Sequence, residues 1–220
     1  MSQPINQNRM RWMVWSIMFL VILTIGLAWA FYAYPFQEPY NFFKETISML
    51  GGINSEQGFG NFPSYAIFTI GFLIVSVLSL VASILYLANS EDFEYGILKG
   101  ILILMIAIGT FGTAIMHDLM QIIHGIGAFM FVSGFGITNF VWQLLRYARK
   151  LEQPPENRRW DFYLDAVFVW ILLASILVYF VFTAIYYFLG YLTFTYVATS
   201  QKVLLICIII ATFLLDRDDM

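Results

Sequence analysis

The sequence predicts an all-α polytopic membrane protein with six transmembrane helices in one bundle, and three observations support this prediction. The chain has at least five stretches without Asp, Glu, Lys or Arg, one of which runs from Ala166 to Gln201. Of its 220 residues, 60% are hydrophobic and 11% are charged, against roughly 25% charged residues in soluble domains. Its basic residues also gather on one side of the predicted topology. A helix needs roughly 20 apolar residues to cross the hydrocarbon core, and a lipid-exposed backbone must satisfy its own hydrogen bonds, so the charge-free stretches are predicted to be helices.

The first predicted helix covers about residues 12–34 and is ended by Pro35. The second covers about residues 63–87, and Pro63 suits a first helical turn, where no backbone N–H is needed. Residues 35–62 between them form the longest predicted loop.

The third and fourth predicted helices cover about residues 96–116 and 119–145. Only His117 and Asp118 separate them, which predicts a tight hairpin. The polar segment 146–165 follows and is predicted to be a connecting loop.

Residues 166–215 contain a single charge, Lys202, and are long enough for two helices, at about residues 166–189 and 195–215. The whole chain, residues 1–220, is therefore predicted to form one transmembrane domain.

The distribution of charge predicts the orientation. An even number of helices places both termini on one side, together with the loops after the second and fourth helices. That side holds nine of the eleven basic residues: Arg9, Arg11, Lys99, Arg146, Arg149, Lys150, Arg158, Arg159 and Arg217. Since basic residues concentrate in cytoplasmic segments, we expect both termini to be cytoplasmic.

Small residues recur at helical spacing in several predicted helices. They are Ser76, Ser79 and Ser83 in the second helix, Gly96, Gly100, Gly109, Gly112 and Thr113 in the third, and Gly125, Gly127, Gly134 and Gly136 in the fourth. Small side chains let helix backbones approach closely in lipid, so these rows are predicted to be packing faces.

Titratable groups within membrane helices are costly, and they raise a functional hypothesis. A polar cluster in the outer half of the bundle is predicted from Glu45, Ser48, His117, Asp118, His124 and Lys202. A charged Lys202 facing lipid near the helix centre would cost on the order of 3 kcal/mol, so we expect it to face the interior and pair with Asp118 or Glu45. Three interpretations of the cluster remain open: a structural network, a site for a lipid headgroup, and a metal or catalytic site.

The basic segment after the fourth helix is predicted to touch anionic headgroups. The residues concerned are Arg146, Arg149, Lys150, Arg158 and Arg159. Each such residue near a charged membrane surface contributes about 1 kcal/mol. An ordinary cytoplasmic loop with no lipid preference is the alternative.

No motif identifies a cofactor or a known type of active site. The chain lacks HExxH, a phosphate-binding loop and a nucleophile elbow. We expect no metal, no cofactor, no catalytic residue and no nucleic-acid partner.

Three short segments resemble the Frag/DRAM/Sfk family of six-helix membrane proteins. The runs Thr46-Ile47-Ser48-Met49-Leu50-Gly51-Gly52 and Gly58-Phe59-Gly60-Asn61-Phe62 are similar to the first loop of that family. The run Ile123 to Gly134 resembles its fourth helix, and Phe213-Leu214-Leu215-Asp216 its terminal helix end. Gln201-Lys202 departs from the pattern, in which an acidic residue often precedes an aromatic one. An uncharacterised prokaryotic six-helix family with a Ser-x-Leu-Gly first loop fits equally well.

The resemblance implies a lipid-linked membrane modulator and assigns no catalytic residue. We therefore expect a non-enzymatic, multi-pass integral membrane protein that binds lipid or a partner membrane protein. A lipid-remodelling enzyme or hydrolase using the outer cluster is the alternative. A small transporter is a second alternative, disfavoured because no midplane charge or broken helix pair is evident.

Overall fold

The structure, a computed structural model, describes residues 7–35, 39–115, 120–152, 154, 160–191, 193–216 and 219–220. Six helices in this part of the chain are long and apolar enough to cross a membrane. They are α1 (Gln7–Ala30), α2 (Phe62–Ala88), α3 (Gly96–Ala114), α4 (Gln121–Leu151), α5 (Trp160–Ala184) and α6 (Phe194–Phe213). This architecture is that of a multi-pass membrane protein.

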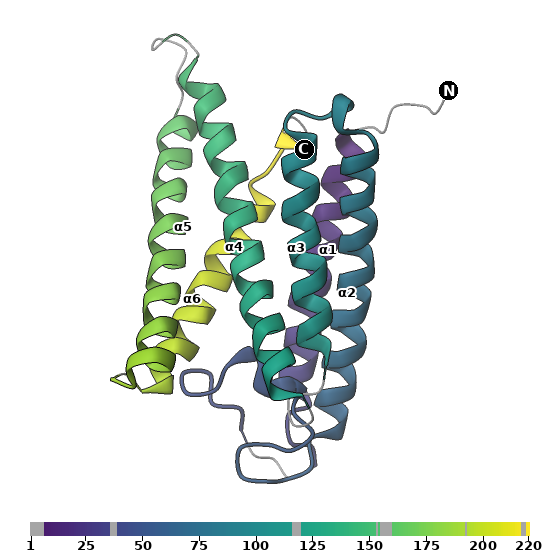
Figure 1. The fold of residues 1–220 in the computed structure, drawn as a ribbon, viewed down its shortest axis with the longest axis vertical. Coiled ribbons are helices and arrows are strands. Elements are labelled where there is room, and N and C mark those ends of the chain that lie inside the picture. Colours follow the sequence, from purple (N-terminus) through teal and green to yellow (C-terminus); the bar gives the residue numbers. More distant parts are fainter. Residues whose placement is uncertain are drawn as a thin grey trace.

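The helices form a single bundle in which neighbours in sequence are neighbours in space (Figure 1). In addition, α6 crosses the bundle obliquely and contacts α4 and α1. Helix α1 begins and α6 ends at the same end of the bundle, which we call the terminal end (Figure 1). The loop of residues 39–61 lies at the opposite end, which we call the loop end. Helix α5 lies at the periphery, where it contacts α4 and α6.

Glycines bring α3 and α4 into backbone contact. A Cβ atom added at Gly127 would lie 2.3 Å from the carbonyl carbon of Gly112, and one added at Gly109 would lie 2.4 Å from the backbone nitrogen of Phe131. No larger residue fits at these points without a shift of the backbone. Two of the serines that were predicted to lie on a packing face also join α2 to α3 by hydrogen bonds. The Ser76 hydroxyl donates to the Ala107 carbonyl and the Ser83 hydroxyl to the Gly100 carbonyl, each at 2.8 Å.

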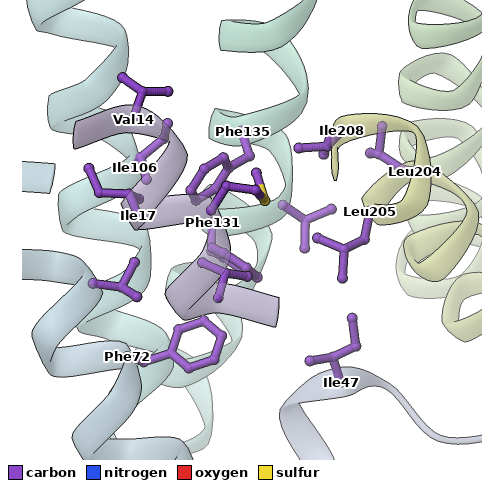
Figure 2. Packing of buried hydrophobic residues seen from close by; sticks show 14 of the residues in the cluster. Val14, Ile17, Ile47, Phe72, Ile106, Phe131, Phe135, Leu204, Leu205 and Ile208 are labelled. Carbon is purple, nitrogen blue, oxygen red and sulfur yellow. The ribbon is translucent and has the colours of Figure 1, made fainter. Parts of the chain in front are cut away.

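The hydrophobic core lies where α1, α2, α3, α4 and α6 meet (Figure 2). Aromatic side chains form its centre: the Phe72 ring meets the Phe131 ring edge to face at 5.0 Å, and Phe131 meets Phe135 in the same way at 5.4 Å. Leu204, Leu205 and Ile208 extend this core onto α6.

The observed bounds of three helices differ clearly from the sequence-based expectation: α1 begins at Gln7 and α5 at Trp160, both earlier than predicted, and α4 ends later. Helix α1 ends at Ala30, and residues Phe31–Pro35 form a turn in which Ala33 has a positive φ of 49°. Helix α4 continues to Leu151, so Arg146, Arg149 and Lys150 belong to a helix and the connecting loop is shorter than residues 146–165. Basic residues in a last turn interact favourably with the helix dipole, so polarity alone does not end a helix there.

The loop between α1 and α2 folds back against the loop end of the bundle. A short 3₁₀ helix, η1 (Ile47–Gly51), buries Ile47 and Leu50. The fully buried Asn61 side chain accepts a hydrogen bond from the Ala33 backbone at 2.7 Å and donates to the carbonyls of Leu50 and Gly52. This one amide therefore ties both ends of the loop together and fixes η1 in place.

Candidate functional site

A pocket of about 120 Å³ lies at the loop end, between η1, α4, α5 and α6. We call it the polar pocket because it is lined by these polar side chains: Thr46, Ser48, Gln121, His124, Tyr179, Thr183, Tyr187 and Gln201. None of the described residues that line it is Asp, Glu, Lys or Arg. The pocket therefore offers hydrogen bonds, with one titratable imidazole and no permanent charge.

His124 is held in a defined tautomer. Its side chain is 1% exposed, and Nδ1 lies 2.6 Å from the carbonyl oxygen of Ile115. Since a carbonyl only accepts, Nδ1 carries the proton and donates. In the neutral ring, Nε2 is then the hydrogen-bond acceptor.

The η1 side of the pocket is joined to α6 by Gln201. Its Oε1 accepts a hydrogen bond from the backbone nitrogen of Ile47 at 3.0 Å. On the same side, the hydroxyls of Thr46 and Ser48 are bonded to each other at 2.8 Å. The loop thus contributes a polar wall to the pocket, held by hydrogen bonds.

An apolar groove of about 730 Å³ adjoins the polar pocket between α4 and α5. We call it the lateral groove. Its walls include Ile122, Ile126, Phe180 and Phe188. The groove shares five lining residues with the polar pocket: Gln121, Gly125, Phe129, Thr183 and Tyr187. The two spaces therefore adjoin along these residues, and a Cβ atom added at Gly125 would meet nothing within 4 Å.

The lip of the groove is a π-helical turn, η4 (Ile185–Leu189), that continues α5. It presents strongly exposed aromatic side chains, with Phe188 86% and Tyr187 67% exposed. Single π turns within helices are frequent at functional sites. Here Tyr187 and Phe188 of the turn both line the lateral groove and are exposed at the surface of the protein.

Lys202 lies near the polar pocket but does not line it. Its side chain is 3% exposed, and Nζ donates to the backbone carbonyl of Glu45. The same Nζ lies 5.0 Å from the centre of the Phe42 ring and 5.5 Å from that of the Tyr40 ring. Cation–π attraction of this kind stabilises a desolvated ammonium group. Lys202 thus faces the interior, toward the loop.

Glu45 is also buried, and its carboxylate accepts a hydrogen bond from the Asn41 backbone at 2.7 Å. The Tyr40 hydroxyl donates to the Glu45 carbonyl at 3.0 Å. Burial, and secondly the charge of Glu45, raise the pKa of Tyr40 above its usual range, so the phenol stays protonated as a donor.

The predicted cluster is therefore divided by the structure. Ser48 and His124 both line the polar pocket, whereas Lys202 is hydrogen-bonded to the Glu45 carbonyl beside it. His117 and Asp118 lie outside the described residues. Sequence reasoning missed Tyr179, Thr183 and Gln201, although Tyr179 and Thr183 have a spacing that places them on one helical face of α5.

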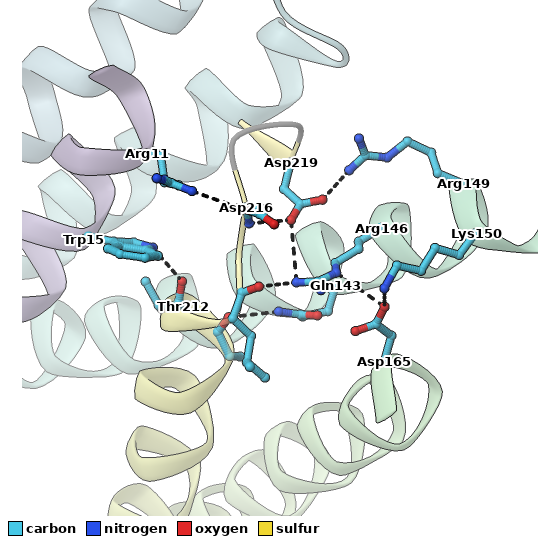
Figure 3. Close-up of polar contacts among 12 residues, drawn as sticks. Arg11, Trp15, Gln143, Arg146, Arg149, Lys150, Asp165, Thr212, Asp216 and Asp219 are labelled. Carbon is cyan, nitrogen blue, oxygen red and sulfur yellow. Dashed lines mark hydrogen bonds and ion pairs between the residues drawn. The ribbon is translucent and has the colours of Figure 1, made fainter. Parts of the chain in front are cut away.

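A second polar network lies at the terminal end (Figure 3). Asp165 on α5 lies 2.5 Å from Lys150 Nζ and 3.3 Å from Arg146 Nε, both on α4. Asp219 lies 2.5 Å from Arg149 Nη2 and 3.6 Å from Arg146 Nη1.

Arg146, Arg149 and Lys150, which were expected to contact anionic lipid, are thus paired with carboxylates of the protein itself. Arg158 and Arg159, expected in the same role, lie outside the described residues. The described residues contain no group of three or more His, Cys, Asp or Glu side chains that could hold a metal ion.

No protein-family model, curated protein or solved structure matches the chain.

Proposed function

We propose that the chain is a non-enzymatic membrane protein that binds a membrane lipid at the loop end, with an acyl chain in the lateral groove and the polar end of the lipid in the polar pocket. The observation that carries this proposal is that the two spaces adjoin and share five lining residues, among them Gly125 and Phe129. The groove also has the volume typical of ligand sites, roughly 300–1,000 Å³. An apolar groove that opens between two membrane helices and leads into a polar pocket suits an amphipathic ligand.

The lining of the polar pocket favours a lipid with an uncharged polar group, such as a hydroxyl or an ester. Phosphate recognition often employs Arg or Lys, and neither is among the described lining residues. The first turns of α4 and α6 do line the pocket, and a helix N-terminus can bind an anion, so the test below compares uncharged and anionic headgroups. Neutral donors and acceptors on Ser48, Thr183 and Gln201 match hydroxyl and carbonyl oxygens.

Two segments that suggested the Frag/DRAM/Sfk resemblance meet at this pocket. Thr46 and Ser48 come from the first-loop run and His124 from the helix-four run. Membership in that lipid-linked family, or in a related prokaryotic one, is part of the proposal.

A lipid hydrolase is the competing function, because Ser48 and His124 share the pocket. A serine nucleophile is activated by a hydrogen bond to its base. The hydrogen bond of the Ser48 hydroxyl with Thr46 supports a binding role instead.

Filling the open space beside Gly125 is expected to weaken lipid binding. A Cβ atom added at Gly125 would meet nothing within 4 Å, so the larger side chain of Gly125→Leu fits the fold and occupies the space that the ligand would use. We expect photolabelling by a diazirine diacylglycerol to fall about tenfold, which corresponds to about 1.4 kcal/mol of binding free energy.

The matched control is Gly26→Leu on α1, where an added Cβ atom also meets nothing within 4 Å. It should label as the unaltered protein does. If Gly125→Leu is labelled as strongly as the unaltered protein, the proposal is contradicted. If the unaltered protein is labelled more strongly by a diazirine phosphatidic acid than by the diacylglycerol, the ligand does not have an uncharged headgroup. Release of fatty acid would identify the protein as a hydrolase.

The orientation with cytoplasmic termini is proposed from the positive-inside rule. After replacement of Cys207 by Ala, we expect a cysteine at Asn54 in the loop to react with an impermeant maleimide from outside intact cells. A cysteine at Glu152, which follows α4 at the terminal end, should react only after permeabilisation. Labelling of both from one side would defeat the six-helix topology.

A further inference from the structure

Three polar atoms in the interior of the bundle have no hydrogen-bond partner among the described residues. They are the hydroxyl oxygens of Ser79 on α2 and Thr138 on α4, and the indole nitrogen of Trp142 on α4. The three residues are 0%, 1% and 3% exposed. Buried polar groups are almost always hydrogen-bonded, and a buried Trp N–H usually finds an acceptor. Three unpaired groups close together therefore require a physical explanation.

Nearby hydroxyl groups on the same helices do have hydrogen-bond partners. Ser76 and Ser83, on the same helix as Ser79 and at helical spacing, both donate to carbonyls of α3. On α4, the Ser133 hydroxyl donates to the carbonyl of Phe129 one turn earlier, at 2.6 Å. Ser79 and Thr138 have the same chemistry but make neither kind of bond.

All three residues line one interior cavity of about 20 Å³. It lies where α1, α2, α3, α4 and α6 meet, and every residue that lines it is buried. Asn139 and Thr212 lie in its wall, but their polar atoms are engaged: the Thr212 hydroxyl donates to Asn139 Oδ1 at 2.9 Å. To hold one water molecule, a cavity needs about 10–15 Å³ of space for the centre of the molecule, together with two to four polar partners. This cavity has room for one water molecule, and the three residues whose polar atoms lack a partner are among those that line it.

The donors and acceptors also match water. The indole of Trp142 can only donate, whereas the hydroxyls of Ser79 and Thr138 can accept. One water oxygen can accept from the indole while its two hydrogens are donated to the two hydroxyls. A metal cation does not suit the site, because no carboxylate is among the residues that line it.

We propose that one water molecule is bound in this cavity and bridges α2 to α4 through Ser79, Thr138 and Trp142. Helices in lipid are not driven together by hydrophobicity, so such a bridge adds to the direct hydrogen bonds and close backbone contacts that hold the bundle. This site is separate from the polar pocket, and the inference does not depend on lipid binding.

The test is water-edited solid-state NMR of the full chain, labelled with ¹⁵N-indole tryptophan, in lipid bilayers. The chain has six tryptophans, and Trp142→Phe assigns the signal of interest. We expect magnetisation from water to reach the Trp142 indole. The indole of Trp15 is the internal control, because it donates to the Thr212 carbonyl at 3.1 Å and needs no water.

The double variant Ser79→Ala/Thr138→Val removes both hydroxyls with little change of shape. We expect it to lose the water signal at Trp142, while an unchanged Trp15 signal shows that the bundle is folded. Absence of water transfer to Trp142 in the unaltered protein would overturn the proposal. Persistence of full transfer in the folded double variant would overturn it as well.

Discussion

Replacing Gly127 by Ala is expected to destabilise the bundle by about 1–3 kcal/mol, the usual range for forcing extra atoms into a packed interior. The new Cβ atom would lie 2.3 Å from the carbonyl carbon of Gly112 and 2.6 Å from the backbone nitrogen of Thr113. Both atoms belong to the backbone of α3, so no side-chain rotation relieves the contact. Helices α3 and α4 would have to separate along this face. Equilibrium unfolding in mixed detergent micelles measures the change.

Gly125→Ala is the matched control on the same helix. An added Cβ atom there meets nothing within 4 Å, and alanine has the higher helix propensity. We expect stability equal to or slightly above that of the unaltered protein. If both alanine variants unfold alike, the close approach of α3 and α4 is not a determinant of stability.

Asp165→Asn is expected to lower the free energy of unfolding by about 3 kcal/mol. The Asp165 side chain is 6% exposed and lies between the side chains of Arg146 and Lys150, which are 16% and 19% exposed. Removing one charge of a buried ion pair costs roughly 3–5 kcal/mol, because the charge of its partner loses compensation. Arg146 keeps a second carboxylate, since its Nη1 lies 3.6 Å from Asp219. We take the lower part of that range because the two basic groups retain some contact with solvent.

A double-mutant cycle with Lys150→Met separates lost attraction from unpaired charge. The double variant is expected to recover part of the stability lost in Asp165→Asn, because it removes one of the two positive charges that face Asp165. Glu94→Gln serves as a comparison: Glu94 is 46% exposed and lies 3.6 Å from Arg149, so we expect a change within about 1 kcal/mol. If Asp165→Asn lowers the free energy of unfolding no more than Glu94→Gln does, the ion pairs of Asp165 contribute no more to stability than an exposed pair.

The number and approximate positions of the helices could be predicted from the sequence because charge-free runs of sufficient length have few other structural solutions. Their ends could not be predicted in the same way. Arg146, Arg149 and Lys150 interrupt the apolar pattern, but α4 continues through them because the carboxylates of Asp165 and Asp219 pair with them. Those partners come from α5 and from the residues after α6, which no local pattern reveals.

The candidate site was predictable only where a polar residue carries a high cost in an apolar helix. His124 and Lys202 stand out for that reason. Lys202 is buried as expected, but it lies against the Glu45 carbonyl and two aromatic rings, a partnership that depends on the path of the first loop. Uncharged polar residues such as Thr183 and Gln201 cost little in a helix, so only the packing of α5 and α6 shows that they line the pocket.

The position of α5 at the edge of the bundle has a mechanical consequence. At the terminal end, Asp165 holds α5 to α4 by ion pairs. At the loop end the helix passes into the exposed π turn, beside an apolar groove. A rod held firmly at one end and by weak dispersion forces at the other deforms most easily by tilting about the firm end. Such a tilt would widen the lateral groove beside Gly125 while the ion pairs and the central core stay intact, so the lipid of the proposed function would enter sideways from the bilayer without the unfolding of any helix.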